Sequence, residues 1–303
     1  MKSIFIVLAA LIIIPGCSSP EKVNRTKPHI VATTSMLYDA LINIGKDSIT
    51  AEAIMGPGVD PHLYKATQGD LAKFKNADMI VFNGIQLEGK MSDILKKLGM
   101  QKPVVAAAEA IPKEMLLSAV GYQDAYDPHV WFDINRWKIA VEEIAKALTT
   151  EDSVNAAYYR NNANIYLNQL TELDSFVRQE LEKIPTSQRI LVTAHDAFGY
   201  FGDSYRIQVK GLQGISTVAD FGLKDIAEII DLIIENNIKA IFVETSVSEK
   251  SINAVITGCQ EKGHNVKVGG YLYSDAMGAL GTEEGTYLGM FKKNVKTIVE
   301  SLR

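Results

Sequence analysis

The sequence predicts an α/β protein of two similar lobes, each with a mainly parallel sheet, bridged by one long rigid α-helix. Short β-rich runs alternate with amphipathic stretches in both halves of the chain, which is typical of parallel sheets flanked by helices. Residues 150–184 contain neither Gly nor Pro and keep apolar residues at helical spacing. The length of 303 residues suits two domains of about 100–200 residues each.

The first half of the chain alternates regularly from residue 30 onward. The predicted strands are 30–34, 49–55, 78–83 and 104–107, and the predicted helices are 36–45, 71–77, 91–98 and 135–148. In the first of these helices, Leu37, Leu41 and Ile44 fall on one face, as expected of a helix that packs on a sheet. These elements predict an N-terminal lobe over residues 28–149.

A single long helix is predicted over residues 150–185. Thr150 has the character of an N-cap, with Glu151 and Asp152 in the first turn, and Pro185 ends the pattern. At 1.5 Å per residue such a helix is roughly 50 Å long. One domain rarely contains a helix of that length, so we expect it to connect two lobes. A coiled-coil segment is the alternative, but the stretch lacks clean heptads.

The alternation resumes after the long helix. The predicted strands are 189–194, 207–210, 239–244 and 266–271, and the predicted helices are 223–236, 251–262 and 286–302. Together they predict a C-terminal lobe over residues 186–303. Cys259 lies on the apolar side of one of these helices, where a small buried residue is the expected role.

Composition and charge indicate a globular protein that does not bind nucleic acid. The chain is 47% hydrophobic and 22% charged, with a formal net charge of -5, which is ordinary for a globular protein. No basic run is present, so we expect no nucleic-acid partner. We expect the protein to be a monomer.

The N-terminus has the features of an export signal. Met1 and Lys2 precede an unbroken apolar run of eleven residues, 4–14, whereas a membrane-spanning helix needs about 20. The run ends in residues 14–17 (IPGC), which resemble the bacterial lipobox, in which the cysteine becomes lipidated. We therefore predict a signal peptide over 1–16, lipidation of Cys17 and a polar tether over 17–27. A signal peptide followed by a free Cys17 is the alternative.

Two of the five histidines occur in the same tripeptide, Asp-Pro-His, at 60–62 and 127–129. Proline restricts the backbone there, and a rigid loop that presents one imidazole suits a metal site. His195 directly follows a predicted strand of the second lobe, and Asp275 follows another. In open α/β sheets the loops at the carboxyl ends of strands carry the ligand site.

Three imidazoles and one carboxylate at strand ends predict a site for a divalent transition metal, with His62, His129, His195 and Asp275 as ligands. Imidazole suits zinc, copper, iron and nickel, while carboxylate also suits harder ions. The other two histidines, His29 and His264, lie at a strand start and in a turn. We expect both to be structural or solvated.

Five stretches of this sequence resemble the cluster A-I substrate-binding lipoproteins of zinc and manganese ABC importers, and the resemblance covers nearly the whole mature chain. The stretches are residues 58–64 (GVDPHLY), 127–131 (DPHVW), 193–201 (TAHDAFGYF), 274–278 (SDAMG) and 285–290 (GTYLGM) followed by Asn294 and Val295.

The resemblance implies two α/β lobes bridged by a rigid helix, with one Zn²⁺ or Mn²⁺ per chain held between them. By position, it implies His62 and His129 as ligands from the first lobe, and His195 and Asp275 as ligands from the second. It also implies an extracytoplasmic receptor, anchored by lipid to the cell membrane. Such a receptor delivers its ion to an importer made of a permease and an ATPase subunit.

Two features of the resemblance concern the choice of metal. Many manganese-type members have Glu where this chain has His195, which favours zinc. Members dedicated to zinc often carry a loop rich in His and acidic residues before the second ligand, whereas residues 119–126 contain no His. Zinc is therefore the favoured ion, and manganese stays open.

Three other functions compete with that of a metal receptor. A secreted zinc hydrolase is disfavoured because no His-Glu-x-x-His motif is present and because four protein ligands leave no open position for water. Glu244, at a strand end, is expected to orient a ligand histidine or cap a helix rather than act as a general base. A receptor for an organic ligand is disfavoured because the long helix argues against wide hinge closure, and a role as a surface adhesin stays open. We expect no enzymatic activity.

Overall fold

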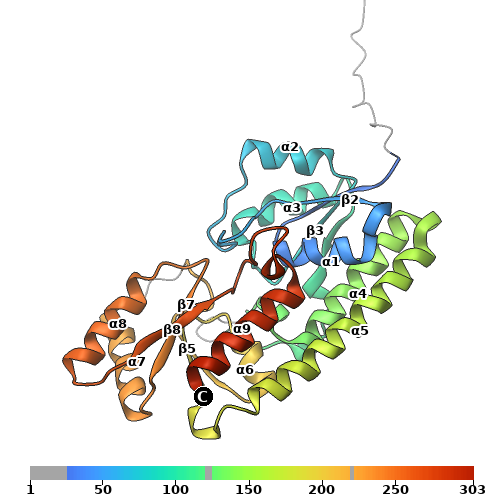
Figure 1. Cartoon of the computed structure of the whole chain (residues 1–303). Helices are drawn as coiled ribbons and strands as arrows, with labels where there is room; N and C mark the ends of the chain where they lie inside the picture. Colours follow the sequence, from blue (N-terminus) through green and yellow to red (C-terminus); the bar gives the residue numbers. More distant parts are fainter. Residues whose placement is uncertain (1–25, 120–124, 219–221) are drawn as a thin grey trace, which may run out of the picture.

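The computed structural model describes residues 26–119, 125–218 and 222–303, and it shows two α/β lobes beside a pair of long helices (Figure 1). The predicted fold class is confirmed. The predicted signal peptide (1–16) and Cys17 lie outside the described residues, as does most of the predicted tether (17–27).

The first lobe is a four-stranded parallel sheet in the order β2-β1-β3-β4. Its strands are β1 (His29–Ala32), β2 (Thr50–Ala53), β3 (Met79–Phe82) and β4 (Val104–Ala106). Its helices are α1 (Ser35–Gly45), α2 (Gln68–Asn76), α3 (Ser92–Gly99) and α4 (Ile134–Glu151). Alternate residues of β1 face opposite cores: Ile30 and Ala32 pack with α1 and α4, while Val31 packs with α2 and α3. The sheet is thus covered on both faces, as parallel sheets require.

The second lobe contains two parallel strand pairs, β5 with β6 and β7 with β8, and β5 also lies alongside β7. The strands are β5 (Ile190–His195), β6 (Gln208–Gln213), β7 (Ala240–Glu244) and β8 (Lys267–Leu272). The helices are α6 (Gly199–Tyr205), α7 (Leu223–Glu235), α8 (Lys250–Glu261) and α9 (Tyr287–Leu302). Helix α6 is not predicted from the sequence, because so short a helix has little periodicity to detect.

Short 3-10 helices occupy the connections. They are Lys46–Ser48, Gly89–Met91, Ala107–Ala110, Lys113–Met115, Val130–Phe132, Ser153–Asn155, Thr186–Gln188 and Glu283–Gly285.

The predicted single helix over 150–185 is wrong in its start and its length. Helix α4 continues to Glu151, and α5 begins only at Ala156 and ends at Leu181. Thr150 is not an N-cap, because its hydroxyl donates to the Lys146 carbonyl at 2.9 Å within the last turns of α4. The helix breaks at Asp152, whose φ of -128° and ψ of 78° are not helical. At 26 residues, α5 is about 39 Å long.

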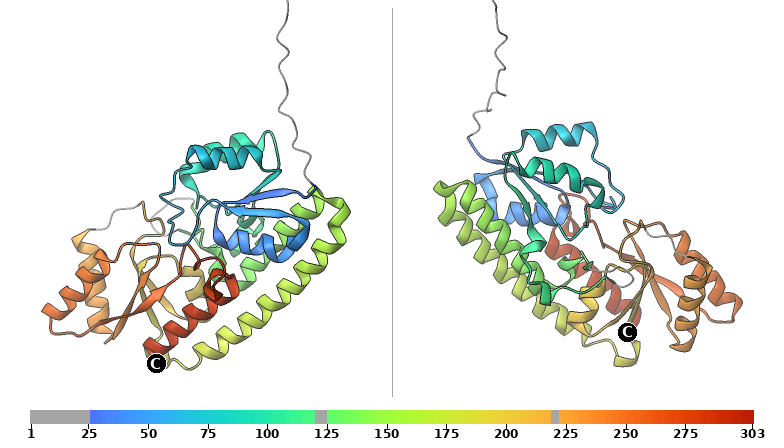
Figure 2. Two further views of the ribbon diagram at one scale, coloured as in Figure 1. Left: turned by 45° about the horizontal axis from the view of Figure 1, so that its top comes forward. Right: turned by 180° about the vertical axis from the view of Figure 1, so that it is seen from behind.

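Helix α5 still bridges the lobes. It runs beside α4 and packs on α1 of the first lobe and α9 of the second (Figure 2). One continuous hydrophobic core includes residues of all these helices. Two polar contacts fix α5 against α1: Tyr166 donates to Asp39 Oδ2 at 2.8 Å, and Asn162 Nδ2 donates to the Ile44 carbonyl at 2.9 Å. Close packing across this interface restrains movement of one lobe against the other.

Cys259 is fully buried in α8 beside Ile252 and Val255, which confirms the expected apolar role.

None of the helices in the described ranges combines the length and apolar character needed to cross a bilayer.

Replacing Leu170 by Ala is expected to lower the free energy of unfolding by about 2–5 kcal/mol, because the side chain is completely buried near the middle of α5. Chemical denaturation of the metal-free protein measures the loss. Ile165→Ala, in the same helix at a side chain that is 53% exposed, is the control and should cost less than about 1 kcal/mol. Equal losses for both variants would contradict the bridging role of this face.

Candidate metal centre

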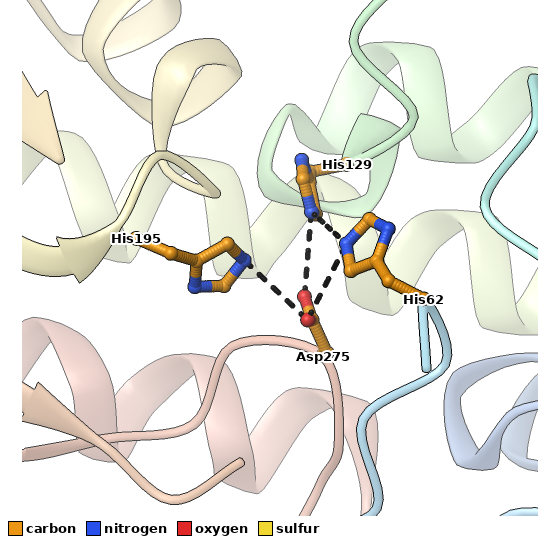
Figure 3. A group of neighbouring side chains, drawn as sticks. All are labelled: His62, His129, His195 and Asp275. Atoms are coloured by element: carbon orange, nitrogen blue, oxygen red, sulfur yellow. Dashed lines mark hydrogen bonds and ion pairs between the residues drawn. The ribbon is translucent and has the colours of Figure 1, made fainter. Parts of the chain in front are cut away.

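The four predicted ligands come from four separate segments and meet between the lobes. His62 lies between β2 and α2, and His129 directly precedes the 3-10 helix Val130–Phe132. His195 is the last residue of β5, rather than the first residue after it, and Asp275 follows β8. All four side chains are buried, and Figure 3 shows the three imidazoles arranged around the carboxylate.

The distances between the facing atoms match a metal's coordination sphere. His62 Nε2 lies 3.2 Å from His129 Nε2 and 3.6 Å from Asp275 Oδ2. Asp275 Oδ1 lies 3.4 Å from His129 Nε2, and Asp275 Oδ2 lies 3.4 Å from His195 Nε2. Ligands about 2.0–2.1 Å from a tetrahedral ion are about 3.3 Å from one another. These four separations are close to that value, and all four candidate ligand atoms lie within 4.8 Å of one another, so the groups could hold one ion.

Several of these polar atoms have no hydrogen-bond partner in the described part of the chain. They include both carboxylate oxygens of Asp275 and Nε2 of His195, all of them buried. A buried polar atom without a partner costs free energy. A cation at the common centre would give these atoms a partner, so the donor set fits a divalent metal ion.

The two Asp-Pro-His tripeptides fold into the same turn. Asp60 Oδ1 accepts a hydrogen bond from the His62 backbone N–H at 2.8 Å, and Asp127 Oδ1 accepts one from the His129 backbone N–H at 2.9 Å. An aspartate that bonds the backbone two residues ahead forms an Asx turn, and the proline between fixes φ. In both places the Asp-Pro-His tripeptide therefore orients its histidine, as the sequence indicates.

Carboxylates lie behind two of the imidazoles. Asp127 Oδ1 lies 2.7 Å from His129 Nδ1. Glu244, the last residue of β7, contacts His195 Nδ1 through Oε2 and accepts the His195 backbone N–H through Oε1 at 2.8 Å. Such contacts hold the proton on Nδ1, so that Nε2 faces the centre of the site, and they would make the imidazole a better ligand for a metal ion.

The sequence predicts an orienting role for only one of these two carboxylates. Glu244 orients His195, which confirms one of the two roles expected for it. The Asp-Pro-His pattern predicts a rigid turn at Asp127, but it does not predict the contact with the His129 ring. No sequence signal marks this difference, because Asp60 stands in the same tripeptide yet directs its second oxygen to Thr217, at 2.6 Å.

The three histidines of the site differ in pKa in the metal-free protein. Burial lowers the pKa of His62 to about 3, and the other two imidazoles add to this. For His129, burial is outweighed by Asp127 and Asp275, which raise its pKa to about 9. For His195, burial is likewise outweighed by Glu244 and Asp275, and its pKa lies well above the ordinary value.

The charges of His129 and His195 also change the pKa of Asp275. Burial would raise the pKa of Asp275, but His195 and His129 hold it well below its ordinary value. The metal-free centre thus holds an ionised Asp275 and protons on two imidazoles. A divalent ion that displaces those two protons leaves the total charge of the buried site unchanged.

One side of the site borders a pocket of about 370 Å³. Of the four ligands, only His62 lines it, together with Gln86 and Tyr126 from the first lobe and Ser216 from the second. His62 is therefore the candidate ligand on the accessible side, while His129, His195 and Asp275 are enclosed.

The remaining histidines lie outside the site, as expected. His29 Nε2 lies 3.0 Å from Glu52 Oε1 at the sheet edge, and His264 Nε2 lies 2.8 Å from the Ile238 carbonyl.

Trp131 ties the loop of one ligand to the loop of another. Its ring packs 5.3 Å from the imidazole of His129, and its Nε1 donates to the Ser274 carbonyl at 3.0 Å. Ser274 directly precedes Asp275. The first-lobe turn that carries His129 is therefore fixed against the second-lobe segment that carries the carboxylate.

Comparison with known proteins gives consistent matches along the chain. Residues 30–301 match the family model of the periplasmic zinc-uptake complex component A, ZnuA. The manganese-binding lipoprotein MntA of Bacillus subtilis is 51% identical over 299 residues, covering 98% of this chain and 97% of the relative. The zinc-binding protein TroA of Treponema pallidum is 42% identical over 276 residues, covering 91% of this chain and 89% of the relative.

A solved structure of the periplasmic zinc-binding protein TroA from Treponema pallidum superposes with a TM-score of 0.89. It is 42% identical in the aligned part, which covers 91% of this chain and 99% of that one. The two proteins therefore share their fold over the aligned part of the chain.

Glu244→Gln is expected to weaken metal binding by about 10–100-fold, because the neutral amide no longer supports the His195 ring. A chelator competition titration measures the affinity. Glu261→Gln, at an exposed position in α8, is the matched control and should bind as the unaltered protein does. Unchanged affinity in Glu244→Gln would show that the carboxylate does not tune the ligand.

Metal binding at pH 7.5 is expected to release about two protons per ion, because His129 and His195 have raised pKa values in the metal-free protein and must lose their protons to bind. Affinity should rise with pH at least up to the His129 pKa of about 9. Calorimetry in two buffers of different ionisation enthalpy counts the protons. Binding without proton release, at an affinity independent of pH between 6 and about 9, would contradict this charge assignment.

Proposed function

Because the chain belongs to the ZnuA family of metal-binding receptors of ABC importers, we propose that His62, His129, His195 and Asp275 hold the single ion that the protein captures. The protein is a substrate-binding receptor for a divalent transition metal, zinc or manganese. The ion is its cargo. The observation that carries the ligand assignment is the convergence of four buried donor groups at the spacing of a coordination sphere, with some of their atoms lacking a hydrogen-bond partner among the described residues.

The geometry favours retention of the ion over catalysis. Three imidazoles and a carboxylate fill a tetrahedral sphere, whereas catalytic zinc keeps one position open for water. Glu244, the residue considered as a general base, lies behind His195 on its Nδ1 side. It therefore faces away from the position where a substrate would bind. Neither the family nor the relatives support a hydrolase or an adhesin.

The donor set favours zinc over manganese in intrinsic affinity, because zinc lies later in the Irving–Williams order and imidazole suits it well. The relatives carry names of both metals, manganese for MntA and zinc for TroA. We propose that the site binds both ions and that zinc binds more tightly. Metal supply then decides which ion is carried.

We propose that the receptor works outside the cytoplasm, attached by lipid on Cys17, and delivers its ion to a permease that is driven by an ATPase subunit. The lipoprotein names of MntA and other relatives support this. We propose residues 28–149 and 186–303 as the two lobes, each of which contributes two ligands. Release then requires loss of ligands across the interface between them.

Purified protein is expected to bind one Zn²⁺ or Mn²⁺ per chain, with zinc displacing manganese in a competition titration. His195→Glu should reduce the preference for zinc, measured as the zinc affinity divided by the manganese affinity, by roughly tenfold or more. The reason is that a carboxylate replaces a nitrogen donor that zinc prefers. His264→Gln changes a histidine outside the site and serves as the control. Failure of the unaltered protein to bind either metal would refute the proposed function.

A further inference from the structure

The carboxylate of Asp60 makes contacts with both lobes. Its Oδ1 accepts the His62 backbone N–H at 2.8 Å, and its Oδ2 accepts the Thr217 hydroxyl at 2.6 Å. Thr217 belongs to the second lobe, in the segment that follows β6. One side chain therefore orients a ligand of the first lobe and is itself held by the second.

The connection continues from Thr217 to another ligand. Gln213, the last residue of β6, donates from Nε2 to the Thr217 carbonyl at 2.7 Å. Gln213 also pairs in register with His195 at the end of β5. A short chain of contacts thus links His195, at the rigid strand end, to His62 in the loop of the other lobe.

The second Asp-Pro-His turn is tied to the same lobe in a different way. Tyr200 of α6 donates to the Asp127 carbonyl at 2.9 Å and is completely buried. Thr217, by contrast, is only partly buried, and its neighbours Ser216 and Val218 line the pocket beside His62. Of the two ties, the one to His62 is the one that can open without disrupting the core.

We propose that Thr217 is a positioning residue that acts through Asp60 to keep His62 on the ion, and that it thereby sets the rate of metal release. The inference rests on the proposed function. When the hydrogen bond from the Thr217 hydroxyl to Asp60 breaks, the second lobe no longer holds the Asp60 turn, and His62 can withdraw toward the pocket.

The other three ligands stay in place during this movement. Asp127 holds the ring of His129, and Glu244 holds the ring of His195. Asp275 is enclosed. Loss of one ligand on the accessible side therefore opens the coordination sphere without dismantling the rest of the centre.

The test is the rate at which zinc-loaded protein loses its ion to excess chelator in a stopped-flow experiment. Thr217→Val keeps the shape but removes the hydroxyl, and it should release zinc roughly tenfold faster. Thr217→Ser keeps the hydroxyl and should restore a rate close to that of the unaltered protein. Thr257→Val removes an exposed hydroxyl that bonds the Asn253 carbonyl within α8, and it is the matched control.

A second comparison separates positioning from a general structural effect. In a His62→Ala background, Thr217→Val should no longer change the release rate, because the ligand through which Thr217 acts is gone. Any change that Thr217→Val makes to the melting temperature of the metal-free protein should be the same in the two backgrounds, because the hydrogen bond to Asp60 is lost in both. If Thr217→Val does not fold, Thr217→Ala takes its place in both comparisons.

The outcomes distinguish this inference from the function beneath it. Protein that binds no zinc refutes the proposed function, and this inference with it. Protein that binds one zinc per chain, but in which Thr217→Val releases it at the unaltered rate, refutes the inference alone. The same holds if Thr217→Val speeds release equally in the His62→Ala background.

Discussion

The structure is organised around a buried carboxylate that faces three imidazoles. Asp275 and His195 have atoms in the interior that no donor or acceptor of the described residues satisfies. Such an arrangement is costly in a folded protein. Protons on His129 and His195 offset part of this cost in the metal-free protein, and a metal ion at the centre would take their place. The rest of the molecule keeps these side chains together in spite of that cost.

Support for the centre comes from the sheet edges. Parallel strands end at the same edge, so β5 and β7 place His195 beside Glu244, and β8 leads directly to Asp275. The first lobe contributes its two histidines from Asx turns whose aspartates are tied to the second lobe, Asp60 by Thr217 and Asp127 by Tyr200. Ligand geometry and lobe placement are therefore coupled.

The helical layer limits how the lobes can move. Helix α5 packs on α1 and on α9 within one hydrophobic core that crosses from lobe to lobe. Opening the site by a wide hinge motion would break this core. Small movements of loops at the accessible side, where His62 borders the pocket, need no such disruption. Capture and release of an ion therefore fit local changes better than a large closure.

Local patterns in the chain were enough to predict the α/β class, the strands, most helices and the four candidate ligands, because periodicity and the repeated Asp-Pro-His are signals carried by near neighbours. They were not enough to place the helix break at Asp152, since Thr150 suits a cap and a helix end alike. The contact of Asp127 with the His129 ring, and the reach of Thr217 to Asp60, became visible only in the folded molecule. Those contacts join residues brought together by packing, and no local pattern records which neighbours packing will supply.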